Sequence, residues 1–262
     1  METGQLMFFR KLWRLMKVVA HFAYGVAELI VKRPHTRPER AAWLSTFCRR
    51  VLRSMHMTYT AEGPVPMSGA VISNHLSYVD ILVHAATRPC VFVSKIEVRR
   101  QPVIGWISMM SGTVYVERGA GGSAEAAAAV MSKGFRDGLP VVFFPEGTTG
   151  VGDEEAMPFR SGLLAQALAA GAAVTPGFIR YELDPKDIAR GKSVRNDVAW
   201  GPQGFGAHIW NFLGLAPVKC TIRFAEVPIA YSPNAYKDRK VAAVESREAV
   251  LAVAHSGVTP AR

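Results

Sequence analysis

Cysteine is scarce in this chain of 262 residues, and its three cysteines lie far apart, at Cys48, Cys90 and Cys220. An odd number of widely spaced cysteines fits neither a disulfide framework nor a zinc site, because both need residues paired at regular spacings. The chain also has no Walker loop and no Gly-x-Ser-x-Gly elbow. We therefore expect buried thiols in a reducing compartment and no metal centre. We expect neither a Walker-type nucleotide site nor a serine nucleophile on a Gly-x-Ser-x-Gly elbow.

Long hydrophobic runs are lacking too. The longest piece near the N-terminus, about residues 18–31, is interrupted by His21 and Glu28 and falls short of the ~20 residues that a membrane span requires. A narrow polar stripe runs beside a broad apolar surface on the predicted helix, and consists of Arg10, Arg14, Lys17, His21, Glu28 and Lys32. This pattern is typical of a helix lying in the membrane interface, with its basic residues near an anionic leaflet. A helix packed on the protein body is the other interpretation, and a single span is a third.

Acidic residues are rare in the first part of the chain. Residues 1–60 contain eleven Lys/Arg against three Asp/Glu, so they carry +8 of the net charge of +10. This asymmetry indicates an anionic partner. We expect membrane lipids and no nucleic acid, because no zinc-finger spacing, RNA-binding signature or basic heptad region is present. Residues 1–60 are thus predicted to form a membrane-associating helical pair, broken at Pro34 and Pro38, before a catalytic body over residues 61–262.

Short apolar runs alternate with helical patterns in that body. This order predicts an α/β fold with a largely parallel central sheet flanked by helices. Strands are expected at 70–72, 90–93, 113–116, 141–144, 174–179 and 219–224, with helices near 78–87, 102–111, 123–136, 160–170, 205–213 and 234–254. Ligands bind beyond the carboxyl ends of the strands in such sheets. Polar residues that follow the strands should therefore share one edge.

A histidine and an aspartate follow the first of these strands, in the run Asn-His-Leu-Ser-Tyr-Val-Asp at 74–80. A histidine that acts as a general base needs a partner at its second ring nitrogen, and Asp80 is placed to be that partner of His75. Side chains five positions apart on a regular helix point about 140° apart. The pair meets only if His75 precedes the helix and Asp80 lies in its first turn. In the other interpretation, Ser77 and Asp80 merely cap the helix.

Two further segments place polar residues after strands. Glu146, Gly147 and Thr148 form a compact turn that fits a head group or an oxyanion, but also fits an ordinary solvated turn. Arg118 follows the strand at 113–116, where it could bind a phosphate, pair with Glu146 or simply be a surface arginine. Residues 119–124 match the pattern Gly-x-Gly-x-x-Ala of a dinucleotide-binding loop, but no suitable strand-to-helix unit leads into them. No dinucleotide is expected.

Taken together, these segments resemble the 1-acyl-sn-glycerol-3-phosphate acyltransferase family of membrane glycerolipid enzymes. The family's block Asn-His-x-x-x-x-Asp matches at 74–80, and Gly-x-(aromatic)-(aliphatic)-x-Arg matches through 112–118. Phe-Pro-Glu-Gly-Thr matches at 144–148, and an aliphatic-x-Pro strand matches at 174–176. Order and spacing also agree, so the resemblance covers about residues 65–180.

The resemblance implies an enzyme that moves a fatty acyl group from acyl-CoA or acyl-carrier protein to the free hydroxyl of a lysophospholipid. No cofactor or metal is implied, and the place of action is peripheral or monotopic on the cytoplasmic face of the inner membrane. His75 would be the general base, and Asp80 would orient it. The implied substrate-binding residues are Asn74, Ser77, Arg118, Glu146, Gly147, Thr148 and Thr149.

One position departs from the family pattern. The third block usually continues with Arg-Ser, whereas Thr149 and Gly150 follow here. A missing arginine weakens the expectation of tight phosphomonoester binding. Residues 195–200, with Phe205, His208 and Trp210, resemble a bacterial branch that includes acylation of lyso-ornithine lipid. The acceptor is therefore open between lysophosphatidic acid and another lysolipid, and thioester hydrolysis and simple lipid binding remain alternatives to transfer.

Overall fold

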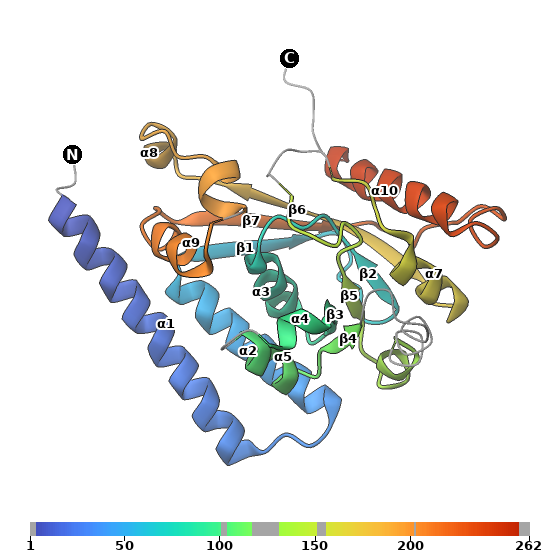
Figure 1. Cartoon of the computed structure of the whole chain (residues 1–262), viewed down its shortest axis with the longest axis horizontal. Helices are drawn as coiled ribbons and strands as arrows, with labels where there is room; N and C mark the ends of the chain where they lie inside the picture. The colour runs from blue at the N-terminus through green and yellow to red at the C-terminus, as the bar shows by residue number, and fades with distance from the viewer. Residues whose placement is uncertain (1–3, 101–103, 117–130, 151–155, 202, 257–262) are drawn as a thin grey trace.

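A seven-stranded sheet forms the centre of the described part of the chain. The structure, a computed structural model, describes residues 4–100, 104–116, 131–150, 156–201 and 203–256. The strands are β1 (Met57–Glu62), β2 (Ala70–Ile72), β3 (Val91–Lys95), β4 (Val114–Val116), β5 (Val141–Phe143), β6 (Val174–Glu182) and β7 (Val218–Phe224). They are ordered β1-β7-β6-β2-β5-β3-β4, and every neighbouring pair is parallel except β6 with β7. The predicted α/β class with a largely parallel sheet is confirmed (Figure 1).

Helices cover both faces of this sheet. They are α1 (Gly4–Lys32), α2 (Arg37–Ser54), α3 (Tyr78–Thr87), α4 (Ile96–Arg99), α5 (Ile104–Met110), α7 (Ser161–Ala169), α8 (Pro185–Ile188), α9 (Phe205–Phe212) and α10 (Arg239–His255), with a π-helix η1 at Val194–Val198. Alternate strand residues point to opposite faces, so Val71 joins the core under α2 and α3, and Ile72 joins the core under α7 and α10. Burial on both faces explains the continuous apolar runs in the sequence.

The edge strand β1 was missed by the sequence analysis. Its residues alternate between buried and solvated, beginning with buried Met57 and exposed Thr58, and it pairs only with β7 in the sheet order. It therefore has no continuous apolar run to predict it. The boundary predicted after residue 60 falls inside this strand, and α2 packs on α3 as part of the same core.

Most of the polar stripe of α1 faces the protein, as in the second interpretation of the sequence, a helix packed on the protein body, while Lys32 at its end is exposed. Arg14 is 4% exposed, and its Nη1 donates to Leu213 O at 3.0 Å and also to Leu215 O. Arg10 Nη2 donates to Gly214 O at 2.5 Å. These carbonyls lie at and just beyond the end of α9, where a helix leaves acceptors without partners. The two arginines are turned inward because they satisfy these acceptors.

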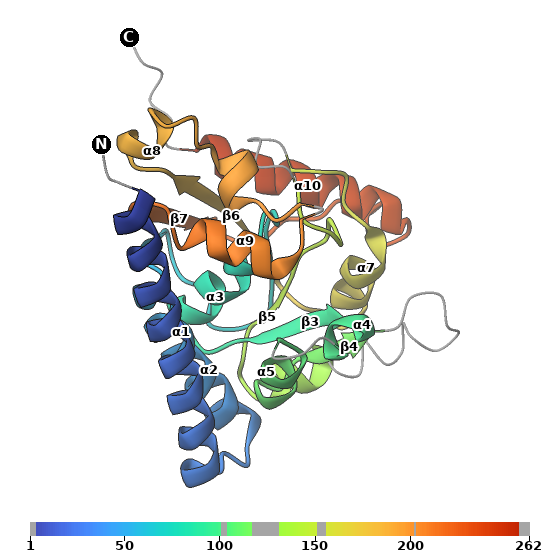
Figure 2. The ribbon, with the colours of Figure 1, turned by 60° about the vertical axis from the view of Figure 1, so that its left-hand side comes forward.

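The opposite side of α1 carries large apolar side chains in solvent. These side chains, here called the outer face of α1, are Leu6, Phe8, Phe9, Leu12, Trp13, Met16 and Val19. The helix lies along the outside of the molecule in both views (Figures 1 and 2). Within the described ranges, no helix combines the length and the apolar composition needed to cross a bilayer. A contiguous exposed patch of this kind marks an interaction surface.

Candidate active site

His75 and Asp80 meet where β2 leads into α3. Ser77 occupies the N-cap position of α3, so His75 lies before the helix and Asp80 in its first turn. His75 Nδ1 lies 2.8 Å from Asp80 Oδ2. Asp80 is fully buried, while the His75 side chain is 15% exposed. The geometry required for a histidine–carboxylate pair is therefore present, with the histidine as the partly exposed member of the pair.

Asp80 also caps its helix, so the two interpretations of the sequence, a helix cap and a partner of His75, are both correct descriptions of its contacts. Its Oδ2 accepts hydrogen bonds from Leu76 N at 2.6 Å and from Ser77 N at 2.9 Å. These backbone donors hold the carboxylate in place and bend the loop back toward it. The cap thus brings His75 within reach of Asp80.

The turn after β5 wraps around His75. Because β2 and β5 are parallel neighbours, their carboxyl ends lie at the same edge, as predicted. The His75 ring stacks on Phe144, with ring centroids 4.0 Å apart and planes 12° apart. Its backbone N donates to Glu146 Oε1 at 3.1 Å, and its carbonyl accepts from Gly150 N at 2.6 Å. Contacts from the ring and the backbone thus fix the position of His75 from both sides.

Glu146 is a buried acid beside this pair. It is 4% exposed. Burial raises its pKa to about 8, the nearby Asp80 acts in the same direction, and the hydrogen bond from His75 N opposes both. Gly147 follows it with φ of 70°, a left-handed conformation that a residue with a side chain adopts less readily. The turn therefore holds Glu146 in an environment that favours its protonated form.

Glu146→Gln is expected to gain stability relative to the wild type as the pH rises from about 5 to about 8. The folded protein keeps a proton that an unfolded glutamate releases above its ordinary pKa of 4.5, so wild-type stability falls through this window up to the folded pKa of about 8. Glutamine keeps the hydrogen bond from His75 N and has no such proton to lose. The difference should reach a few kcal/mol. Thermal unfolding at pH 5, 6.5 and 8 measures it, with exposed Glu226→Gln as the control; a gap that stays constant with pH contradicts the prediction.

Two of the predicted substrate-binding residues, Asn74 and Ser77, are buried. Asn74 is 2% exposed, and its side-chain amide donates to Ile179 O at 2.9 Å and accepts from Ile179 N at 2.7 Å. The amide thereby continues the pairing of β2 with β6 beyond Ile72. Ser77 is fully buried at the N-cap. The Asn74 amide thus positions the loop that carries His75, and a contact of Asn74 or Ser77 with substrate stays a prediction.

The other predicted binding residues lie in the turn after β5 or outside the described residues. Thr148 is exposed and Gly147 is partly exposed beside the pair. Thr149 Oγ1 donates to Trp200 O at 2.6 Å, so its hydroxyl is engaged within the protein. Arg118 lies outside the described residues.

A group of ring side chains packs together at the start of α3. It comprises Tyr78, Trp200, Phe205 and His208, here called the aromatic wall. Tyr78 OH lies 3.0 Å from His208 Nδ1, and its ring centroid lies 4.9 Å from that of Phe205. Trp200 N donates to Leu76 O at 2.8 Å, which ties the wall to the His75 loop. Burial raises the pKa of Tyr78 well above its usual range, so the phenol stays protonated. Phe205, 41% exposed, extends the wall to the surface.

Tyr181 was missed by the sequence analysis. It lies on β6, and its hydroxyl donates to Asp80 Oδ1 at 2.5 Å across 101 positions of sequence. A tyrosine that ends an apolar strand looks like an ordinary core residue, so no local pattern indicates this contact.

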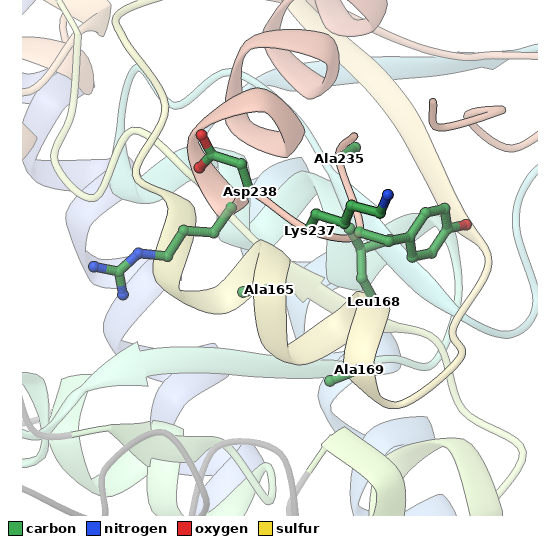
Figure 3. Close-up of a pocket in the computed structure, with 8 residues that line it drawn as sticks. Ala165, Leu168, Ala169, Ala235, Lys237 and Asp238 are labelled. Carbon is green, nitrogen blue, oxygen red and sulfur yellow. The ribbon is translucent and has the colours of Figure 1, made fainter. Parts of the chain in front are cut away.

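Other features of the described residues lie away from the pair. A cavity of about 490 Å³ lies between α7 and the start of α10 and is lined in part by Leu168, Lys237 and Asp238 (Figure 3). It is at the edge where α7 leads into β6, opposite the edge that carries His75. Within the described ranges, no group of three or more histidine, cysteine or acidic side chains is arranged to hold a metal ion.

Comparison with known proteins places this geometry in a family. The family model described as "Acyltransferase" matches residues 56–180, which include His75, Asp80 and the Glu146 turn. The chain is 30% identical over 207 residues to the lyso-ornithine lipid O-acyltransferase of Rhodobacter capsulatus, covering 76% of this chain and 72% of that protein. The chain belongs to this acyltransferase family. It is an acyltransferase, and the acyl donor of such an enzyme is a substrate.

Two further proteins are also similar to this chain. The 1-acyl-sn-glycerol-3-phosphate acyltransferase of Neisseria meningitidis serogroup B is 29% identical, covering 78% of each chain. The crystal structure of the 1-acyl-sn-glycerophosphate (LPA) acyltransferase PlsC from Thermotoga maritima has a TM-score of 0.59 at 19% identity, covering 92% of this chain and 96% of that one. The structural likeness concerns the fold. Identities of 30% and 29% do not discriminate between the two acceptor classes.

Proposed function

We propose that this acyltransferase transfers a fatty acyl group from a thioester to the free hydroxyl of a lysolipid, with His75 as the general base. The observation that carries the proposal is the 2.8 Å contact between His75 Nδ1 and fully buried Asp80. Because Asp80 occupies Nδ1, Nε2 is the nitrogen that accepts the proton of the acceptor hydroxyl. Asp80 stabilises the imidazolium that forms.

The reaction then proceeds without a covalent enzyme intermediate. The acceptor oxygen, losing its proton to His75 Nε2, attacks the thioester carbonyl. The tetrahedral adduct collapses with cleavage of the carbon–sulfur bond, and the departing thiolate takes the proton from His75. General-base help supplies about 10²–10⁴-fold. Orientation of the two substrates beside His75 supplies much of the remainder.

The acceptor head group is proposed to lie over the turn after β5. Exposed Thr148 offers a hydroxyl there, next to buried Glu146, and partly exposed Gly147 leaves room for a head group beside the turn, while its own amide donates to Phe144 O at 3.1 Å. Arg118 is retained as a proposed head-group contact. The aromatic wall, which reaches the surface at Phe205, provides an apolar approach for an acyl chain.

Lyso-ornithine lipid is the acceptor that we favour. The residue after Thr148 is Thr149, where the resembling family usually has an arginine, and its hydroxyl is engaged by Trp200 O. A phosphomonoester therefore finds one cation fewer at this turn. Lysophosphatidic acid is the second candidate, supported by the match to the Neisseria enzyme over 78% of both chains.

Residues 1–60 are proposed to hold the enzyme at the membrane while residues 61–262 carry the chemistry. The outer face of α1 supplies the apolar surface, and an interfacial helix buries such a face to about 5–10 Å. A peripheral or monotopic location on the cytoplasmic face of the inner membrane gives access to both lysolipid and acyl-CoA or acyl-carrier protein.

Initial rates against a panel of lysolipids test the acceptor. Purified enzyme is assayed with one acyl thioester and equal concentrations of lyso-ornithine lipid or lysophosphatidic acid in the same mixed micelles. We expect kcat/KM to be at least about tenfold higher for lyso-ornithine lipid, the effect of one lost charged hydrogen bond to phosphate. A preference of that size for lysophosphatidic acid contradicts the favoured acceptor, and no transfer to either lipid contradicts the proposed function.

A further inference from the structure

Tyr181 holds the oxygen of Asp80 that His75 does not use. The Tyr181 hydroxyl donates to Asp80 Oδ1 at 2.5 Å, whereas Oδ2 receives His75 Nδ1, Leu76 N and Ser77 N. Asp80 is fully buried and Tyr181 is 5% exposed. Four protein donors thus surround a carboxylate that is shielded from water.

The strand geometry explains why Tyr181 reaches this position. Ile179 and Tyr181 are two positions apart on β6, so both side chains point to the face covered by α3. Asn74 binds the backbone of Ile179, so the loop that carries His75 is anchored two residues before Tyr181 on the same strand. On the other side, Tyr181 pairs in register with Cys220 of antiparallel β7. The tyrosine is therefore held by sheet pairing rather than by a loop.

The hydroxyl must be the donor in this contact. The pKa of Tyr181 is raised well above its usual value, first by burial and then by the charge of Asp80. A protonated phenol beside an acceptor-only carboxylate donates its hydrogen. Charge-assisted O–H···O⁻ bonds are short, about 2.5–2.7 Å, which matches the observed distance.

We propose that Tyr181 is a positioning residue for the reaction, acting through Asp80. Its hydrogen bond to Oδ1 fixes the plane of the buried carboxylate, so that Oδ2 faces His75 Nδ1. A hydrogen bond to a carboxylate in general favours the charged form over the protonated form. This inference rests on the proposed general-base role of His75.

Tyr181→Phe tests the role by removing one oxygen. A hydrogen bond to a charged group is worth about 1.5–3 kcal/mol, which corresponds to a loss of about 10- to 100-fold in kcat. KM for the lysolipid should stay within about twofold, because Tyr181 is buried away from the acceptor. The acidic limb of the pH profile of kcat/KM should move to higher pH by roughly half a unit or more, because the carboxylate then holds a proton on itself or on His75 more strongly.

Tyr231→Phe is the matched control. Tyr231 is a partly buried tyrosine, with a pKa raised to about 12 by burial, and its hydroxyl lies 2.6 Å from Ser246 Oγ, remote from the pair. We expect it to leave kcat and the pH profile unchanged. If Tyr181→Phe behaves like Tyr231→Phe in both readouts, the inference is wrong. Both variants are assayed well below their melting temperatures, where circular dichroism shows them folded, so that loss of activity is separated from loss of folding.

A double-mutant cycle with Asp80→Ala decides whether Tyr181 acts through Asp80. With enzyme in excess over thioester, Tyr181→Phe should lower the single-turnover rate by less than about twofold once Asp80 is absent, because the coupled partner is gone. The same factor in both backgrounds overturns the inference. His75→Ala in the same assay keeps the two proposals apart: full activity there contradicts the proposed function, whereas a dead His75→Ala with an unaffected Tyr181→Phe contradicts only the role of Tyr181.

Discussion

Replacing His75 with alanine is expected to lower kcat for acyl transfer by about 10²–10⁴-fold, the usual worth of a positioned general base. The variant loses Nε2, the nitrogen that takes the acceptor's proton, while Asp80 keeps its backbone donors Leu76 N and Ser77 N. Product ester formed per minute at saturating thioester and lysolipid measures the effect.

The control for this variant is His255→Ala, at an exposed histidine near the end of α10. It should retain wild-type kcat. A His75→Ala enzyme that keeps more than a few per cent of wild-type transfer, at an unchanged melting temperature, removes His75 from the role of base.

Two acidic substitutions on the outer face of α1, Phe9→Glu with Trp13→Glu, are expected to weaken vesicle binding by more than about 100-fold. Phe9 and Trp13 are 63% and 56% exposed, so the folded protein tolerates the change. Each side chain that leaves the lipid costs about 1.5–3 kcal/mol, and the new charges add to this cost. Co-sedimentation with vesicles containing anionic lipid measures the partition coefficient.

The matched control places the same charges elsewhere. Val227 and Val244 are 70% and 56% exposed and lie outside α1, so Val227→Glu with Val244→Glu should leave binding within a few-fold of the wild type. Equal losses in both double variants would show that net charge, rather than the outer face of α1, controls binding. Transfer to a lysolipid dissolved below its micellar concentration should survive both changes.

The elements that the sequence predicted well are those that the core buries on both faces. The runs at 70–72, 141–144 and 219–224 match β2, β5 and β7 to within one residue at each end. The half-exposed edge strand β1 lacks that signal and was missed. Helix periodicity also identified the polar stripe of α1, but periodicity states which residues share a face and not which face the protein covers. The carbonyls after α9 determine that the stripe faces the protein, and they lie about 200 positions from Arg14 in the sequence.

The candidate site also contains some contacts that local sequence patterns predict and others that they do not. The His75–Asp80 contact depends on the start of α3, which the cap residue Ser77 signals locally. The inward role of Asn74 and the contact of Tyr181 with Asp80 both depend on β6 lying beside β2, more than 100 positions away in sequence. Short-range patterns therefore predicted the pair but not the residues that hold it.

Thiol release from the acyl thioester, followed with and without lysolipid, tests the central claim most directly. The account predicts that release depends on the lysolipid, that one thiol appears for each ester formed, and that His75→Ala abolishes both together. Release that proceeds equally fast without lysolipid, with free fatty acid as the product, would contradict acyl transfer to a lipid hydroxyl and identify hydrolysis as the reaction.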